Sequence, residues 1–134
     1  MSAQNLNIVR AFLEAGERRD WAQIAELADP EVELLGTVGG VEEGRVTRGL
    51  AEVIREVDEE DREAWEERRL EPVELFDAGD EVVVFLHEYR RGRNSGVELE
   101  VDTAVVYTVR EGRVVRMQGY MDRAAAKKAA GLPE

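Results

Sequence analysis

The change of hydrophobic period near Glu66 constrains the fold of this chain more than any other feature of its sequence. Before this point, apolar residues recur every three or four positions, which is typical of amphipathic helices. After it, apolar and polar residues alternate, which is typical of strands with one covered face. The sequence therefore predicts an α+β protein, with helices first and a curved sheet behind them.

Three amphipathic helices and one strand are expected before this change. Asp20 is a favourable N-cap for the second helix, and Pro30 ends that helix because a residue before proline avoids the helical region. In the expected strand, Val32 and Leu34 alternate with Glu33. The predicted helices cover residues 5–20, 21–29 and 49–65, and the strand lies within residues 31–40.

Four further strands are expected after the change, joined by tight turns. The turns DAGD, RGRNSG and REGR each contain glycine, which adopts positive φ at little cost. Connections this short join antiparallel neighbours, because a parallel crossover needs a dozen or more residues. No linker or repeat interrupts the order, so we expect one domain over residues 1–134. The predicted strands cover residues 68–76, 81–90, 97–110 and 113–121, and a short C-terminal helix follows them.

Charge and composition narrow the classes of partner. The chain has 30 acidic against 18 basic residues, a net charge of −12, which repels phosphate backbones and anionic lipids. We therefore expect no nucleic acid or membrane partner. The chain has no cysteine and one histidine, which excludes thiolate and histidine-rich metal sites. We expect no metal, and no motif indicates a cofactor. The N-terminal stretch lacks the pattern of a secretory signal, which favours a cytoplasmic location.

Alternation predicts which side chains face the covered side of the sheet. In the strand at residues 97–110, three acids share one face, so the opposite face is expected to be covered. In the strand at residues 113–121, Arg116 and Gln118 are expected outside. The residues predicted to face inward from these two strands include Thr103, Val105, Tyr107, Met117, Gly119 and Met121.

The strand at residues 81–90 carries the single histidine. The charges of Glu88 and Arg90 favour the outer face, which predicts that Phe85, His87 and Tyr89 face inward. Side chains two residues apart on a strand begin about 7 Å from one another. An imidazole with a pKa near ~6.5 can exchange protons at neutral pH, and a phenol can donate to an oxyanion. His87 and Tyr89 are therefore candidate catalytic residues.

Apolar residues are also expected on the outer face of the sheet. A second apolar patch on a sheet is typical of a surface that meets another copy of the chain. We therefore predict a homodimer formed through the outer face. The residues of this expected patch are Val84, Leu86, Ala104, Val106 and Tyr120.

Four motifs of the chain are specific enough to compare with known families: DAGDEVVV, the turn GRNSG, VREGRVVR and the ending YMDRAAAKKAAGL. They resemble motifs of the SnoaL-like polyketide cyclases in the nuclear transport factor 2-like superfamily, and the resemblance covers nearly the whole chain. It implies a cone-shaped, cystatin-like α+β roll, in which a curved antiparallel sheet and N-terminal helices surround a pocket for a small, mostly apolar molecule. It also implies frequent dimers. The superfamily includes enzymes and non-catalytic binders, so fold alone does not determine function.

Most catalytic residues of the superfamily are missing at the positions that the resemblance matches. Phe12 stands where ketosteroid isomerases have a tyrosine, and Leu34 stands near their general base. Limonene-type epoxide hydrolases use an arginine and an aspartate on a middle strand and a second aspartate on the last strand. The matching positions are His87, Tyr89 and Gly119. SnoaL cyclases pair an acid with a histidine, yet no acid is expected on an inward face here.

Three functions are compatible with these observations. The first is a binding module for a small hydrophobic or carbonyl-containing molecule, which the missing inward carboxylate favours. The second is a cyclase, isomerase or dehydratase with His87 as general acid or base and Tyr89 as oxyanion donor. The third is a dimeric interaction domain with a filled cavity. The expected ligand-binding residues are Phe12, Leu34, Trp65, Phe85, Thr103, Val105, Tyr107, Met117, Gly119 and Met121.

Overall fold

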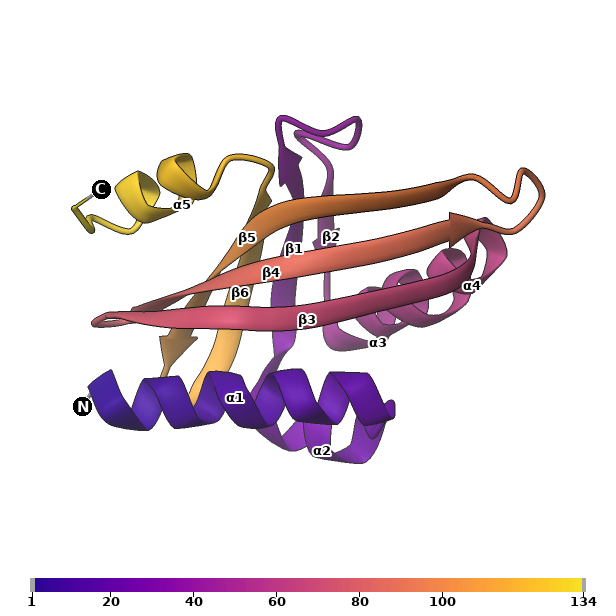
Figure 1. Cartoon of the computed structure of the whole chain (residues 1–134). Helices are drawn as coiled ribbons and strands as arrows, with labels where there is room; N and C mark the ends of the chain where they lie inside the picture. The colour runs from indigo at the N-terminus through magenta and orange to yellow at the C-terminus, as the bar shows by residue number, and fades with distance from the viewer. Residues whose placement is uncertain (1, 134) are drawn as a thin grey trace.

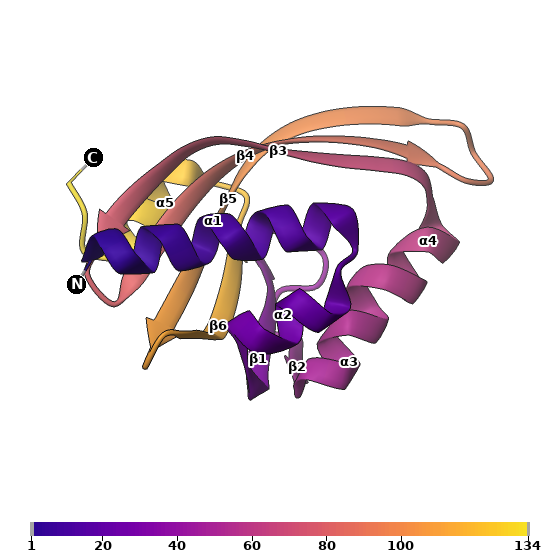
Figure 2. The ribbon, with the colours of Figure 1, turned by 90° about the horizontal axis from the view of Figure 1, so that it is seen from below.

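A single curved sheet with most of its helices on the concave side makes up the structure, a computed structural model that describes residues 2–133 (Figures 1 and 2). The predicted α+β class is confirmed. The helices are α1 (Ser2–Arg18), α2 (Trp21–Leu27), α3 (Leu50–Arg55), the π-helix η1 (Glu56–Glu60), α4 (Asp61–Ala64) and α5 (Arg123–Ala129). The strands are β1 (Ala28–Val38), β2 (Val46–Arg48), β3 (Trp65–Ala78), β4 (Glu81–Gly92), β5 (Glu98–Arg110) and β6 (Arg113–Tyr120).

The sheet contains the four predicted C-terminal strands and two more. Its order is β2-β1-β6-β5-β4-β3, and the neighbours from β6 to β3 are antiparallel as predicted. The expectation of a wholly antiparallel sheet is wrong at one place, because β1 runs parallel to β6. The short strand β2 was not expected. It pairs with β1 and is the edge strand on that side of the sheet.

The predicted third helix is divided into three pieces. After α3, the chain continues through one π-helical segment and the single turn of α4 before β3 begins at Trp65. π-helical segments are rare and often occur at functional sites. Within the described residues, no helix is both long and apolar enough to cross a membrane.

Apolar side chains of the concave face and of the helices form the main core. On α1, Val9 is fully buried, and Phe12 contacts the ring of Tyr107 edge-on with 5.9 Å between ring centroids. Burying such side chains stabilises the fold by about 1.5–3 kcal/mol each. The buried members of this core are Val9, Ala28, Val32, Val53, Val82, Val84, Leu86, Tyr107, Val109, Val114 and Met117.

A smaller core lies on the opposite, outer face of the sheet. There α5 packs against the sheet on the side away from α1 (Figure 2). Ala104 and Val106, both part of the expected dimer patch, are already buried within one chain, at 0% and 4% exposure. Partly buried Phe76, Phe85 and Tyr120 pack around them.

The register between β4 and β5 corrects the predicted direction of the β4 side chains. Residues that pair directly share a face of the sheet. His87 pairs with Asp102, which is outside, and Glu88 pairs with Val101, which is inside. The predicted inward direction of Phe85, His87 and Tyr89 is therefore wrong. The same shift places Val84 and Leu86 of the expected dimer patch in the main core.

The glycine on β6 allows β1 and β6 to approach closely. A Cβ added at Gly119 would lie 2.6 Å from the hydroxyl oxygen of Thr37. Gly119→Ala is expected to lower the free energy of unfolding by about 1–3 kcal/mol, because the Thr37 side chain must rotate or the two strands must separate slightly. A Cβ added at Gly16 in α1 would meet no atom within 4 Å, so Gly16→Ala is expected to raise the free energy of unfolding by about 0.5–1 kcal/mol. Urea unfolding measures both, and an unchanged Gly119→Ala variant would contradict this packing.

Candidate functional site

Charged side chains from α4, β3 and β4 meet on the concave face. We call Asp61, Arg68, Glu88, Arg90 and Thr103 the inner cluster. Arg68 pairs with Arg90 across β3 and β4, and Glu88 lies two residues before Arg90, so all three share the inner face. Thr103 Oγ1 and Arg90 Nη2 each donate to Glu88 at 2.6 Å, and Arg68 Nη2 donates at 3.4 Å. Arg68 Nη1 also donates to Asp61.

Glu88 is the most buried charge of the inner cluster, with 5% of its surface exposed. Burial alone would raise the pKa of its carboxyl group. The hydrogen bonds from Arg90 and Thr103, together with the charges of Arg90 and Arg68, outweigh burial and lower this pKa below its usual value. Glu88 is therefore ionised at neutral pH.

Asp61 has the opposite electrostatic balance. Its burial raises the pKa of the carboxyl group, and the charge of Glu56 raises it further, although Arg68 and Arg90 act against both. Asp61 begins the single turn of α4 directly after the π-helical segment. The inner cluster thus holds one firmly ionised acid and one acid that protonates more readily than usual.

Three polar groups on the concave face have no partner in the described part of the chain. The Nε atoms of Arg68 and Arg90 are buried without a hydrogen bond. Tyr107 is 6% exposed, and no group within residues 2–133 bonds to its hydroxyl. Arg68 and Glu88 lie close enough for their charges to act on the Tyr107 pKa, which burial raises strongly. A buried polar atom without a partner costs about 1–3 kcal/mol, so the two arginine nitrogens, together with the Tyr107 hydroxyl, indicate a place where a ligand oxygen would be favourable.

Apolar side chains flank the inner cluster along the sheet. Leu70 pairs with Glu88, and Leu99 pairs with Arg90, so both lie on the inner face. They are 42% and 43% exposed. The guanidinium carbon of Arg90 lies 5.3 Å from the centre of the Trp65 ring. The cluster therefore combines charged donors with accessible apolar surface.

Seven of the predicted ligand-binding residues lie on the concave side. Thr103 belongs to the inner cluster, Trp65 contacts Arg90, and Phe12 contacts Tyr107. Leu34 of β1 pairs with Met117 of β6, and Val105 packs against the main core. The structure thus brings together Phe12, Leu34, Trp65, Thr103, Val105, Tyr107 and Met117. Whether they bind a ligand stays a prediction.

The remaining predicted ligand-binding residues lie apart from this group. Phe85 is on the outer face, where its ring centroid is 4.8 Å from that of Phe76. Gly119 lies on the inner face, but Thr37 fills the space beside it. Met121 follows β6 and is 42% exposed.

His87 and Tyr89 lie on the outer face among acidic side chains. The distance from His87 Nδ1 to Asp102 Oδ1 is 2.7 Å, and that from Nε2 to Glu100 Oε1 is 3.4 Å. The Tyr89 hydroxyl donates to Glu98 at 2.9 Å. The two predicted catalytic residues therefore do not meet the unpartnered groups of the concave face, and their catalytic role stays a prediction.

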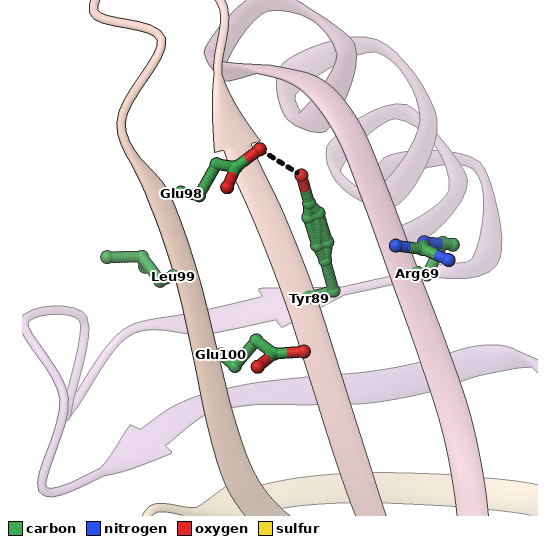
Figure 3. A pocket seen from close by; sticks show the side chains of 5 residues that line it. All are labelled: Arg69, Tyr89, Glu98, Leu99 and Glu100. Carbon is green, nitrogen blue, oxygen red and sulfur yellow. Dashed lines mark hydrogen bonds between the residues drawn. The ribbon is translucent and has the colours of Figure 1, made fainter.

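Two surface hollows contain no residue of the inner cluster. Figure 3 shows the first, where the Tyr89 ring stands between Arg69 on one side and the acids of β5 on the other. Its volume is about 420 Å³, and it is lined by Arg69, Tyr89, Glu98, Leu99 and Glu100. The second, of about 340 Å³, is lined by Glu31, Glu33, Glu81, Thr108, Arg110, Val115 and Arg116. Neither is the apolar pocket that the resemblance implies.

The described residues contain no group of three or more histidine, aspartate or glutamate side chains suited to a metal ion. The carboxylates of the inner cluster instead accept hydrogen bonds from arginine and threonine.

The SnoaL-like domain model matches residues 9–117 of the chain. The chain belongs to the SnoaL-like family. An NTF2-like protein from Burkholderia thailandensis is 26% identical, with a TM-score of 0.77 and coverage of 95% of this chain and 96% of that chain. TerC, co-crystallised with polyporic acid, is 25% identical, with a TM-score of 0.75 and coverage of 96% and 98%. A putative SnoaL-like polyketide cyclase from Jannaschia is 17% identical, with a TM-score of 0.77 and coverage of 99% and 95%.

None of the curated proteins compared with the chain matches it significantly. The family match and the similar solved structures support the predicted SnoaL-like fold, and they leave the reaction open.

The sequence pattern does not predict the inner cluster of this SnoaL-like protein, because the charges of Glu88 and Arg90 favour the outer face. With that assignment, no acid was expected on an inward face, and this expectation is wrong. One signal in the sequence could have found it. The RGRNSG turn brings Arg90 opposite Leu99, which lies between Glu98 and Glu100 and so belongs to the face opposite the acids. Hairpin register, rather than charge, was the better guide to the direction of Glu88.

Glu88 is expected to be essential for the stability of the concave face. Glu88→Gln removes the charge that neutralises Arg68 and Arg90, so the free energy of unfolding should fall by about 3 kcal/mol. Glu71→Gln, the same change at an exposed position of β3, should alter it by less than about 0.5 kcal/mol. Urea unfolding of both variants tests this difference, and equal effects would show that the inner cluster does not contribute to stability.

His87 is expected to make stability depend on pH. Its hydrogen bonds to Asp102 and Glu100 raise the pKa of the imidazole above its ordinary value of 6.5. The folded chain therefore binds the proton more tightly, and this stabilisation is complete below pH 6.5 and is lost as pH rises through the raised pKa. Because the chain has one histidine, its NMR titration needs no assignment. A measured pKa at or below 6.5 would refute this geometry, and Asp102→Asn should lower the pKa.

Proposed function

We propose that this SnoaL-like protein binds a small, mostly apolar molecule that carries a carbonyl or similar oxygen, on the concave face beside the inner cluster. The observation that carries this proposal is the Tyr107 hydroxyl, which belongs to a residue of this face that is 6% exposed and makes no hydrogen bond within residues 2–133. A ligand oxygen placed there would accept a hydrogen bond that the described chain does not satisfy.

The surroundings of the inner cluster support the same kind of ligand. Small-molecule sites are usually apolar surfaces with a few convergent polar groups. Here Trp65, Leu70 and Leu99 supply apolar surface, and the arginines supply donors. Each arginine side chain keeps 27% of its surface exposed, so a ligand can approach it. The co-crystal of TerC with polyporic acid supports a small organic ligand for a chain of this fold.

The second candidate function is acid–base catalysis at the same place. The expected absence of an inward carboxylate favoured binding over catalysis, but Asp61 and Glu88 both belong to the inner cluster. An acid with a raised pKa beside an arginine is a common arrangement for proton transfer. An enzyme of this kind would use Asp61 rather than His87, whose ring lies among the acids of the outer face.

The homodimer and the cytoplasmic location stay predictions. The outer face still offers partly buried Phe85 and Tyr120 to a second copy, but the most apolar part of the expected patch is covered by α5. An interface through this face would therefore have to include the side of α5 as well as the strands beside it.

Thermal shift against quinones, steroids and terpenoid ketones tests ligand binding. A binder should raise the melting temperature, and Tyr107→Phe should weaken its affinity by about tenfold, the equivalent of about 1.4 kcal/mol for one buried hydrogen bond. Tyr107→Phe removes a hydroxyl that has no partner within the described chain, so the fold should persist. Tyr89→Phe on the outer face is the matched control and should leave affinity unchanged. No stabilising compound, or equal losses in both variants, would refute the proposal.

A further inference from the structure

Arg68 is shared between the two acids of the inner cluster. Its Nη1 donates to Asp61 and its Nη2 donates to Glu88. With Arg90 beside them, two arginines face two acids, so the cluster is neutral when both acids are ionised. A neutral cluster in a chain with a net charge of −12 does not attract an anion, unless one of its own acids is first displaced from its arginine.

The two acids are held unequally. Glu88 is 5% exposed, and both of its oxygens accept hydrogen bonds, one from Thr103 and the other from the arginines. Asp61 accepts a side-chain hydrogen bond from Arg68 alone among the described contacts, and its side chain is 31% exposed. It also stands on a single helical turn directly after a π-helical segment, where the backbone is less regular. Asp61 is therefore the easier of the two acids to displace.

We propose that Asp61 is an internal competitor, which occupies Arg68 until the oxyanion of a ligand, a carboxylate or an ionised enol attached to an apolar ring, takes its place. This inference rests on the proposed function and names the chemical class of its ligand. The ring would lie against Trp65 and the exposed Leu70 and Leu99, and the oxyanion would accept hydrogen bonds from Arg68.

Displacement of Asp61 is coupled to a proton. The groups whose charges act on Asp61 are Arg68 from β3, Arg90 from β4 and Glu56 from η1, and Glu88 of β4 shares Arg68 with it. Once an anion occupies Arg68, the main influence that lowers the Asp61 pKa is lost, while burial and Glu56 still raise it. Asp61 then takes up a proton, which keeps the cluster neutral. Anion affinity should consequently rise as pH falls.

Isothermal titration calorimetry with 2-naphthoate and its neutral isostere 2-naphthamide tests this inference. Wild type should bind naphthoate more tightly at pH 6 than at pH 8 and should take up a proton, seen as a heat that changes between phosphate and Tris buffers. Asp61→Asn should bind naphthoate about tenfold more tightly at pH 8, without proton uptake and with unchanged affinity for the amide. Glu63→Gln, an exposed acid on the same helical turn, is the matched control and should behave as wild type.

The outcomes separate this inference from the proposed function. If naphthamide binds and Tyr107→Phe weakens it, but Asp61→Asn does not favour naphthoate, the competitor role is refuted and the binding site stands. If wild type binds naphthoate without proton uptake, the competitor role is refuted. This measurement does not depend on whether Asp61→Asn folds. If neither probe binds, both proposals fail.

Discussion

Neutralisation of Glu88 on the concave face is the interaction on which the candidate site depends. A buried carboxylate costs several kcal/mol unless it is paired and hydrogen-bonded. β4 can turn Glu88 inward because Arg68, Arg90 and Thr103 meet it there. Since side chains alternate along a strand, this one direction determines all the others on β4. The ion cluster inside the curve and the histidine outside it are thus two consequences of the same register.

The sequence predicted the sidedness of β5 and β6 but not that of β4, for a physical reason. In β5, Glu98, Glu100 and Asp102 all lie on one face with no apolar residue between them on that face. The solvent-facing side of this segment can therefore be read from the sequence. In β4 the run from Val82 to Leu86 is apolar on both faces, because α5 covers the outer face and α1 the inner one. Only the two charges at the end of the strand carried directional information. The rule that charges avoid the interior failed because their partner, Arg68, lies on another strand.

The strand pairings likewise have either local causes, which the sequence shows, or causes distant in the chain, which it does not. Tight glycine turns specify the antiparallel neighbours β3 to β6, which the sequence predicted. The parallel pairing of β1 with β6 joins segments far apart in the chain, so no local pattern encodes it. The π-helical segment is also absent from the prediction, which expects one regular helix over residues 49–65. Regular helical spacing places Val57 on the apolar stripe of Val53, yet Val53 is 4% exposed and Val57 is 36% exposed. The wider turn breaks that stripe before Asp61 reaches Arg68.

The inner face of β4 changes from hydrocarbon to charge along its length. Val82, Val84 and Leu86 are buried against the helices, and Glu88 and Arg90 follow toward the open hairpin. A ligand with one oxygen-bearing end therefore has unequal choices, since an unpaired oxygen among the valines costs about 1–3 kcal/mol, whereas the same oxygen beside an arginine gains a charge-assisted hydrogen bond. That difference favours one orientation by tenfold or more. The strand that supplies the charges thus also determines which end of a ligand they meet.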